Sequence, residues 1–372
     1  MGLLPRPRSS ERAEVATAPS SLPAGVIIAE DSETQRRFLR AVIEADERFE
    51  VLGEARTGRE AVALVRRLRP AVLLLDLDLP DLNGLEAIEA IMAEVPTPIV
   101  VCSGYVADGC GNGPAAVAAG AVDVLAKPNS ADLDTLRDYG EAVRERLRVA
   151  SRARVITHPR GRLHPGSRRL ESVGGRQPAT SASVPYPVVC IGASTGGPQA
   201  LRCVLQSLPA DFGAAVVVVQ HMSGGFLPGL VTWLDDLVPL PVVLGHEGAP
   251  VRVGTVTVVP GGVDTLLSPS LRLTTRPPTS GQVHVPSVDA TFLSVADAIG
   301  GSAIGVLLTG MGRDGVAGLS AMHAKGAATI AQDEATSAIF GMPGAAAAAG
   351  CVDRLLPLAD VGPAIVSLVA GG

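Results

Sequence analysis

Ser194 lies in a stretch whose residue types favour nucleophilic chemistry, VVCIGASTGGPQALRCVL (188–205). The apolar residues 188–191 are typical of a strand, and residues 199–205 are typical of the start of a helix. Gly192 and Gly196 flank the serine in the pattern G-x-S-x-G, which in some hydrolases exposes a nucleophile on a tight strand-to-helix turn. Taken alone, the pattern leaves three interpretations open: a nucleophile, a cap beside a bound phosphate, or a turn residue without chemistry.

Two further residues could complete a hydrolase site. The apolar stretch AAVVVVQHM (214–222) predicts a second strand that presents His221 at its carboxyl end, where it is a candidate general base for Ser194. The stretch AIGVLLTGMGRDG (303–315) predicts a strand that ends at Thr309, followed by a glycine-rich turn that carries Asp314. A carboxylate there could orient the imidazole, giving a Ser-His-Asp triad whose chain order differs from that of the α/β-hydrolases.

Dinucleotide binding is the main alternative for the glycine-rich loop. IGASTGG (191–197) after a strand could cradle a pyrophosphate at a helix N-terminus. That function requires a carboxylate at the end of the second strand for the ribose hydroxyl, about twenty residues on. The second strand ends in Gln220 and His221 instead, which argues against it.

The other candidates near this site are weaker. His246 and His323 have no motif around them, whereas His284, in HVPSVD (284–289), could line the pocket. Asp289 in the same segment is expected to be structural rather than catalytic.

Five polar residues end successive strands in the first half of the chain. Glu30 and Asp31 follow one strand, Asp76 a second, Ser103 a third and Lys127 a fourth. The carboxyl ends of parallel strands share one sheet edge, so these side chains should converge. Clustered carboxylates suit Mg²⁺, beside which Asp76 could attack a phosphorus atom. The hydroxyl and ammonium could then hold phosphoryl oxygens.

The elements that position these residues predict two doubly wound α/β domains. In the first, strands at 25–31, 71–77, 98–104 and 122–128 alternate with helices at 32–46, 83–95 and 115–121. In the second, strands are predicted at 187–193, 214–222, 255–262, 302–312 and 326–332. Continuous apolar strands alternating with amphipathic helices indicate a parallel sheet covered on both faces.

Composition changes mark the expected domain limits. We predict an unstructured leader at 1–23, the first domain at 24–147, a linker at 148–186 and the second domain at 187–372. The stretch 151–183 holds seven arginines, one acidic residue and many Gly, Ser and Pro residues, as a linker does. Its His158 and His164 lack zinc-finger spacing.

Bulk composition excludes several classes of protein. A chain of 372 residues with 47% hydrophobic and 18% charged residues is globular, and its length favours two domains. No apolar run approaches the roughly 20 residues of a membrane span, and the arginine-bearing leader lacks the apolar region of a secretory signal. Five irregularly spaced cysteines indicate reduced thiols in a cytoplasmic protein, and a net charge of −6 argues against nucleic acid as the main partner.

The first half resembles the two-component receiver domain. The resemblance rests on the acid pair ED (30–31), LLLDLDLPDLNGLE (73–86), CSG (102–104) and AKP (126–128), in this order. It implies that Asp76 is the phospho-acceptor and that Ser103 and Lys127 support it. It also implies that Glu30, Asp31 and Asp76 bind Mg²⁺, with Asp78 contributing its main-chain carbonyl. Receivers often carry an aromatic residue three positions before the lysine, and here that position is Val124.

The second half resembles the catalytic domain of chemotaxis protein-glutamate methylesterases of the CheB type. The stretches that carry the resemblance are IGASTGG (191–197), QHM (220–222), PSVDATFLSVA (286–296), GVLLTGMGRDG (305–315) and TIAQDEATSAIFGMP (329–343). It implies that Ser194 is the nucleophile, His221 the base and Asp314 the orienting acid. Thr195 is implied to hydrogen-bond near the histidine, and the backbone at Met311 to help form the oxyanion hole.

Together the two resemblances imply a phosphorylation-activated enzyme of chemotaxis signalling. The expected reaction is hydrolysis of glutamate methyl esters on the cytoplasmic helices of chemoreceptors, with glutamine deamidation by the same chemistry. A chemotaxis histidine kinase would be the phosphodonor. Mg²⁺ would serve the receiver and the esterase would need no cofactor; neither nucleic acid binding nor membrane insertion is expected.

Two other functions stay open on the sequence alone. In one, the second domain is a binding module controlled by the receiver, which the intact serine, histidine and aspartate motifs disfavour. In the other, it is an esterase that acts on small molecules.

Overall fold

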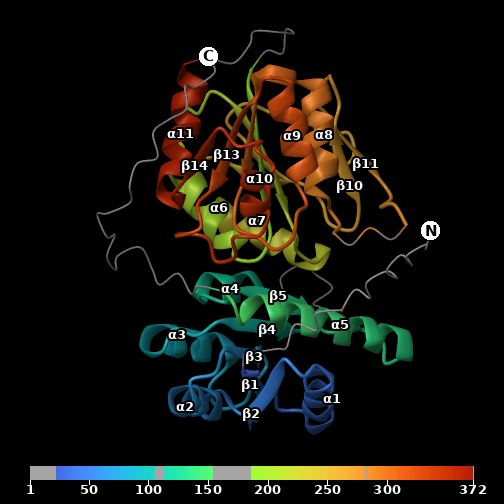
Figure 1. Ribbon diagram of the computed structural model, residues 1–372, viewed down its shortest axis with the longest axis vertical. Helices are drawn as coiled ribbons and strands as arrows, with labels where there is room; N and C mark the ends of the chain where they lie inside the picture. Colours follow the sequence, from blue (N-terminus) through green and yellow to red (C-terminus); the bar gives the residue numbers. More distant parts are fainter. Residues whose placement is uncertain (1–21, 105–112, 154–185, 281, 283, 372) are drawn as a thin grey trace, which may run out of the picture.

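The computed structural model describes residues 22–104, 113–153, 186–280, 282 and 284–371, and it contains two α/β domains (Figure 1). Each domain is built on a parallel sheet, one of five strands and one of seven, so the predicted fold class is confirmed. The predicted leader, apart from residues 22 and 23, and most of the predicted linker lie outside the described residues.

The N-terminal domain has five strands in the order β2-β1-β3-β4-β5, all parallel. The strands are β1 (Ala24–Ala29), β2 (Phe49–Ala55), β3 (Val72–Asp76), β4 (Ile99–Ser103) and β5 (Asp123–Ala126). The helices are α1 (Glu33–Glu44), α2 (Gly58–Leu68), α3 (Gly84–Glu94), α4 (Gly113–Ala119) and α5 (Leu133–Ala150). The sequence had not predicted β2, α2 or α5, and the first residues of the predicted linker continue α5.

The C-terminal domain has seven strands in the order β14-β13-β12-β6-β7-β9-β8, all parallel, with β10 and β11 as a separate antiparallel pair. The strands are β6 (Val188–Ala193), β7 (Ala215–Gln220), β8 (Val242–Leu244), β9 (Val256–Val258), β10 (Asp264–Leu267), β11 (Leu273–Arg276), β12 (Ala303–Leu307), β13 (Ala328–Gln332) and β14 (Arg354–Leu356). The helices are α6 (Gly197–Gln206), α7 (Leu227–Asp235), α8 (Val288–Ala298), α9 (Val316–Ala324), α10 (Met342–Ala348) and α11 (Leu358–Ala370), with short 3₁₀ turns η1 (Gly224–Phe226) and η2 (Gly300–Ser302).

Both faces of the central strands β6 and β7 are buried, as continuous apolar strands predict. Successive side chains of a strand point to opposite faces. In β6, Val189 and Ile191 pack into one apolar cluster with α6 and α11, whereas Val188 and Cys190 pack into another with α8 and α9. The helix layers therefore hold β6 and β7 rigidly in the middle of the sheet, where the candidate catalytic residues follow them.

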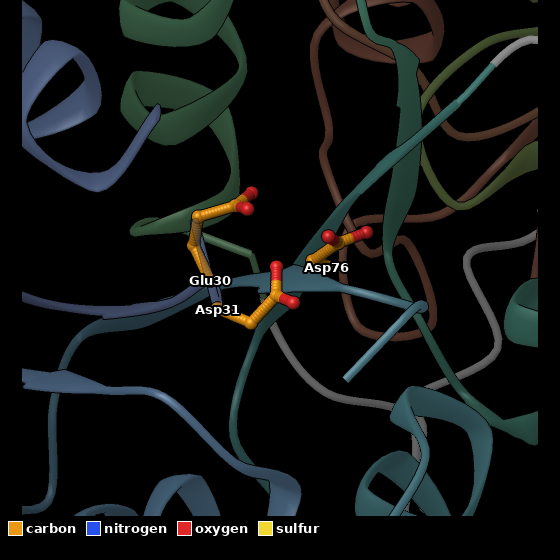
Figure 2. A group of neighbouring side chains, drawn as sticks. All are labelled: Glu30, Asp31 and Asp76. Atoms are coloured by element: carbon orange, nitrogen blue, oxygen red, sulfur yellow. The ribbon is translucent and has the colours of Figure 1, made fainter. Parts of the chain in front are cut away.

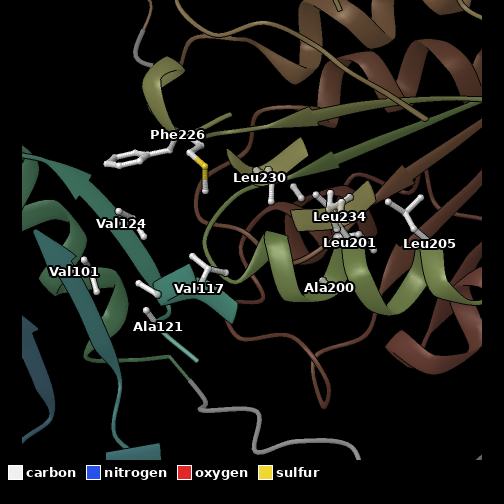
Figure 3. Packing of buried hydrophobic residues seen from close by; sticks show 14 of the residues in the cluster. Val101, Val117, Ala121, Val124, Ala200, Leu201, Leu205, Phe226, Leu230 and Leu234 are labelled. Atoms are coloured by element: carbon white, nitrogen blue, oxygen red, sulfur yellow. The ribbon is translucent and has the colours of Figure 1, made fainter. Parts of the chain in front are cut away.

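The two domains share an apolar core. Figure 1 shows α4 and α5 of the N-terminal domain facing the C-terminal domain, and Figure 3 shows the packing between them. Val117 and Val124 belong to the same buried cluster as Leu201 and Phe226. Phe226 packs so closely on Gly113 that a Cβ added to this glycine would lie 2.6 Å from the ring. Val124, at the position that is aromatic in many receivers, is thus part of the domain interface.

The cysteines and the helix lengths bear on two further expectations. Cys102, Cys190, Cys203 and Cys351, the cysteines in the part of the chain that the structure describes, are free. None of the helices described is both long and apolar enough to cross a membrane.

Candidate active site

Ser194 occupies a sharp turn between β6 and α6. Its side chain is buried, and its N–H donates to the carbonyl oxygen of Thr309 at 3.0 Å, which ties the turn to the end of β12. Gly310 allows this approach, because a Cβ there would lie 2.7 Å from the Cβ of Ser194. The turn therefore holds the serine against a second, glycine-rich loop.

The glycines after Ser194 have separate structural reasons. Gly196 has φ +75°, in the left-handed region that favours glycine, and it begins α6 without any side-chain cap. Gly197 makes room for a neighbouring side chain, because a Cβ there would lie 2.1 Å from Oε1 of Gln220. Ser194 itself does not cap the helix, so a role as a capping residue finds no support.

His221, after β7, and Asp314, on the glycine-rich turn after β12, form a hydrogen-bonded pair. Nε2 of His221 lies 2.8 Å from Oδ2 of Asp314, and both side chains are buried. Nδ1 of His221 is buried and has no hydrogen-bond partner among the described residues. Because the carboxylate can only accept when ionised, the neutral ring donates from Nε2 and keeps a free lone pair on Nδ1. Ser194 Oγ makes no hydrogen bond to a described residue.

Asp314 is held at the N-terminus of α8 by three donors besides the imidazole. Ser287 Oγ donates to Oδ1 at 3.0 Å, Asp289 N–H to Oδ1 at 2.9 Å and Val288 N–H to Oδ2 at 2.8 Å. Burial alone would raise the pKa of the carboxyl, but these bonds and His221 outweigh it and lower the pKa to about 2. The positive end of the helix dipole acts in the same direction. Asp314 is therefore an anion at neutral pH.

His284, expected to line the pocket, stacks on the candidate base. The two rings lie 4.6 Å apart between centroids and 6° from parallel. Burial, with the nearby His221, lowers the pKa of His284, so His284 is neutral at neutral pH and places no positive charge beside the ring of His221. Nε2 of His284 also lies 3.6 Å from a Cβ built on Gly312. His284 therefore lies beside the turn that carries Met311.

Met311 and Thr195 are the two residues expected to assist the triad. Met311 follows β12 on the turn that contacts Ser194, and its N–H makes no hydrogen bond to a described residue. Thr195 does not donate to His221 here. Its Oγ1 donates to Oδ2 of Asp123 in the N-terminal domain at 3.0 Å, and Arg146 from α5 binds the same Oδ2 at 2.9 Å.

Two further hydrogen bonds, both to backbone carbonyl oxygens, join the segment after Ser194 to the N-terminal domain. Gly196 N–H donates to the carbonyl oxygen of Val122 at 3.2 Å, and Gln199 Nε2 donates to that of Val117 at 2.6 Å. The segment around Ser194 is therefore in direct contact with α4 and β5. A polar and charged contact of this kind, beside the apolar core, couples the two domains at the site itself.

At the edge of the five-stranded sheet, the predicted acidic residues converge. Figure 2 shows the carboxyl groups of Glu30, Asp31 and Asp76 beside one another, and an oxygen of each lies within 4.8 Å of the others. Lys127 Nζ lies 2.8 Å from Glu30 Oε2 and 2.6 Å from Asp76 Oδ2. Three hard oxygen donors at this spacing fit Mg²⁺. Burial raises the pKa of Glu30, although Lys127 opposes it.

The other predicted residues of this edge are also near. Ser103 is buried at the end of β4, with Oγ 3.4 Å from the carbonyl oxygen of Gly104. Asp78 is exposed on the following loop, and its N–H donates to Oδ1 of Asp76 at 3.3 Å. The edge thus presents a hydroxyl, an ammonium and carboxylates around Asp76.

Sequence reasoning missed the residues that support both sites. Arg36 is buried in α1, and its Nη1 donates to the carbonyl oxygens of Glu30 at 2.7 Å and Asp31 at 3.0 Å, which fixes the backbone of the acid pair. Ser287 caps α8 and holds Asp314. A serine just before an apolar run is an N-cap signal that could have drawn attention to Ser287, whereas nothing local marks Arg36.

Comparisons with known proteins agree with this division. Residues 26–138 match the response regulator receiver domain, and residues 189–365 match the CheB methylesterase family. The protein-glutamate methylesterase/protein-glutamine glutaminase 2 of Anaeromyxobacter dehalogenans is 43% identical over 347 residues, which span 93% of this chain and 97% of that protein. This chain belongs to the protein-glutamate methylesterase/protein-glutamine glutaminase family. It combines a receiver domain with a methylesterase domain, as the sequence resemblance implied.

Other members are similar over comparable lengths. Protein-glutamate methylesterase/protein-glutamine glutaminase 3 of Paramagnetospirillum magneticum is 39% identical over 353 residues, which span 92% of this chain and 95% of that protein. Among solved structures, the Thermotoga maritima CheB methylesterase catalytic domain is 34% identical; the match covers 50% of this chain and all of that domain, with a TM-score of 0.48.

Proposed function

We propose that this chain hydrolyses glutamate methyl esters on the cytoplasmic helices of chemoreceptors, and that phosphorylation of its receiver activates it. The observation that carries the catalytic part is the hydrogen bond between His221 and Asp314, which leaves Nδ1 of His221 free. His221 follows β7, and Ser194 follows the adjacent strand β6. The names of the relatives support the substrate and add deamidation of glutamine.

The proposed reaction is acyl transfer through a covalent intermediate. Ser194 Oγ attacks the ester carbonyl carbon while His221 Nδ1 takes the hydroxyl proton. Asp314 keeps the Nε2 proton in place and stabilises the imidazolium that forms. The free N–H of Met311 binds the oxyanion. His221 then gives its proton to the departing methoxide, methanol leaves, and water releases the glutamate by the reverse proton path. With glutamine the leaving group is ammonia.

The receiver is proposed to take a phosphoryl group on Asp76 from a chemotaxis histidine kinase. Glu30, Asp31, Asp76 and the main-chain carbonyl of Asp78 would hold Mg²⁺, which neutralises charge on the phosphoryl oxygens when bound. Lys127 already reaches Asp76, so its ammonium is placed to bind a phosphoryl oxygen, and Ser103 supplies a hydroxyl from the next strand. The methylesterase domain is proposed to work without a cofactor.

The position of the receiver supports the proposed gating. In the described arrangement the receiver binds the loop 194–199 directly, through Asp123 and the carbonyl oxygens of Val117 and Val122. This docking would keep a receptor helix from Ser194. Because Lys127 joins β5 to Asp76, a phosphoryl group on Asp76 would shift β5 and disfavour docking, which is a population shift between two domain arrangements.

We also propose the cytoplasm as the site of action, since the substrate helices lie there. The domain limits at 24–147 and 187–372, with a linker between them, remain part of this proposal. Neither membrane insertion nor nucleic acid binding has a role in it.

The direct test is methanol release from membranes that carry methyl-labelled chemoreceptors. We expect release from the wild-type chain, stimulated about tenfold or more by acetyl phosphate with Mg²⁺. Chelation of Mg²⁺ should abolish the stimulation and leave the basal rate unchanged, because the proposed triad contains no metal. Asp76→Ala should keep the basal rate and lose the stimulation.

The outcomes separate the two halves of the proposal. Phosphorylation of Asp76 without methanol release would leave the receiver function and refute the receptor esterase, favouring a binding module or a small-molecule esterase. Release that is unaffected by acetyl phosphate would refute the gating alone.

The contact between Asp123 and Thr195 predicts a second result. Asp123→Ala removes the charged hydrogen bond across the interface and should weaken docking by about 1 kcal/mol. The basal, unphosphorylated rate of methanol release should therefore rise about fivefold, and stimulation by acetyl phosphate should shrink by a similar factor.

Asp134→Ala is the matched control. Asp134 lies exposed in the first turn of α5 and pairs only with Arg137 among the described residues, so its loss should change neither rate. A basal rate of Asp123→Ala equal to that of the wild type would show that this contact does not hold the inhibited arrangement.

A further inference from the structure

Gln220 connects the nucleophile segment to the base segment. It is the last residue of β7, directly before His221, and its side chain is almost fully buried. Its Nε2 donates to the carbonyl oxygen of Ser194 at 2.8 Å and to that of His221 at 3.1 Å. One side-chain amide therefore binds both residues that must exchange a proton in the proposed reaction.

Gln220 makes these hydrogen bonds at the end of the β6–β7 ladder, just before Ser194 and His221 leave the sheet. The β6–β7 ladder ends at the pair Ala193 and Gln220, closed by the bond from His221 N–H to the Ala193 carbonyl at 3.0 Å. Past this point Ser194 has no ladder bond to the next strand. The amide of Gln220 replaces that ladder, while Thr309 holds the opposite side of the same residue through Ser194 N–H at 3.0 Å.

The orientation of the amide follows from its partners. Reversing the amide would place Oε1 against the two carbonyl oxygens, and all three oxygens can only accept hydrogen bonds. In the observed orientation Oε1 is buried without a partner among the described residues and faces Gly197. An unpaired buried acceptor lowers stability by about 1–3 kcal/mol. The two N–H groups of the same amide pair the carbonyl oxygens of Ser194 and His221, the two residues that the proposed reaction uses.

We propose that Gln220 is a positioning residue for catalysis, which fixes the distance between Ser194 and His221. This inference rests on the proposed function, since it concerns the same serine and histidine. Gln220 touches neither the substrate nor the reacting atoms. It acts through the carbonyl oxygens of the two residues that do, and it prevents the turn at Ser194 from moving away from the imidazole. A displacement of about 1 Å at a reacting group can lower the rate about 100-fold.

Two substitutions test the role of the two N–H groups. Gln220→Met has a similar length and no donor, and it should lower kcat for methanol release about 10- to 100-fold with KM within twofold of the wild type. Gln220→Glu keeps the shape but places an ionised carboxylate against two carbonyl oxygens at high pH. When protonated, the carboxyl can donate one hydrogen bond.

The pH dependence of Gln220→Glu distinguishes positioning from a purely structural role. The ratio of its kcat to that of the wild type, measured at each pH, should rise at least fivefold as the pH falls from 8.5 to 6. Dividing by the wild type removes the titration that both enzymes share. Burial next to two acceptors raises the pKa of the introduced carboxyl, which brings its protonation into this range.

Gln206 supplies the matched controls. Its Nε2 donates to the carbonyl oxygen of Leu237 on the surface, at the end of α6. Gln206→Met and Gln206→Glu should keep wild-type kcat and a flat ratio across the same pH range. If Gln220→Met fails to fold, the proposal is tested by the pH dependence of the kcat ratio between Gln220→Glu and the wild type.

The outcomes are distinct. A fall in kcat at constant KM, with the rising ratio in Gln220→Glu, supports the proposal. Folded variants with wild-type kcat overturn the proposal. So does a loss of thermal stability combined with a kcat ratio for Gln220→Glu that does not change with pH. In both cases, methanol release by the wild type leaves the proposed function intact. Absence of release from the wild-type chain refutes the proposed function and this inference with it.

Discussion

Replacing Ser194 with alanine is expected to lower kcat for methanol release by about 10⁴-fold or more, to the level of the assay blank. The hydroxyl is the only group in the proposed mechanism that can form the acyl intermediate, and no neighbouring side chain replaces it. The measurement is release from methyl-labelled receptor membranes with acetyl phosphate and Mg²⁺ present, so that docking of the receiver does not limit the rate.

The fold should tolerate this substitution. Ser194 Oγ makes no hydrogen bond to a described residue, while the contacts that hold the turn use backbone atoms, from Ser194 N–H to Thr309 and from Gln220 to the Ser194 carbonyl. Alanine keeps all of these and retains the Cβ that packs on Gly310. Thermal stability should therefore change by less than about 1 kcal/mol.

Ser320→Ala controls for the loss of a serine hydroxyl. Ser320 Oγ donates to the Val316 carbonyl within α9, and this contact is local to the helix. Its activity should match the wild type. If Ser194→Ala retained even a tenth of the wild-type kcat, the acyl-enzyme mechanism would have to be abandoned.

Most of the central parallel strands were predictable because they are runs of buried residues. All five residues of β3, Val72–Asp76, are buried, and β6 and β7 are buried throughout. β2 was not predicted because it is an edge strand in which Glu50 and Glu54 interrupt the apolar pattern. β8 and β14 were also missed, and they are three-residue strands at the edges of the larger sheet.

The candidate triad was accessible from the sequence for a topological reason. Ser194 follows β6 and His221 follows β7, and adjacent parallel strands bring their carboxyl ends together. Asp314 lies seven residues beyond β12, the other neighbour of β6, so its place depends on the loop. The sequence could suggest its role but not the three donors at α8 that make it an anion.

Contacts between distant side chains were not predictable. Gln220 binds Ser194, 26 residues away, and Thr195 binds Asp123, 72 residues away in the other domain. No periodicity or local motif specifies which side chain meets which across a domain interface. The expectation that Thr195 hydrogen-bonds near the histidine came from family resemblance, and the docked receiver engages that hydroxyl instead.

Asp314→Ala is the second substitution with a large expected effect, a fall in kcat of about 10⁴-fold measured by methanol release. Without the carboxylate, His221 loses the acceptor that places its proton on Nε2, and the imidazolium loses its counter-ion. Asp353→Ala is the control, because this carboxylate binds Thr329 at the far side of the sheet. Wild-type kcat in Asp314→Ala would show that Asp314 is not a member of the triad.

Asp314→Asn should lose less activity than Asp314→Ala. Its amide oxygen can keep the position of Oδ2, where it accepts from His221 and Val288. Its NH₂ then takes the position of Oδ1, where Ser287 Oγ can rotate to accept but the Asp289 N–H cannot. The variant therefore retains the tautomer and loses the charge. An equal loss in both variants would mean that the charge, rather than the orientation, dominates.

The same carboxylate predicts a dependence of stability on pH. The folded pKa of Asp314, about 2, lies below the ordinary value of 3.8, so ionised Asp314 stabilises the fold by about 2 kcal/mol at neutral pH. This contribution is complete above about pH 4 and is lost as the pH falls towards 2. The difference in unfolding free energy between the wild type and Asp314→Asn, measured by denaturant titration, should therefore shrink across that window. A difference that is constant from pH 6 to pH 2.5 would show that the hydrogen bonds at α8 do not depend on the charge of Asp314.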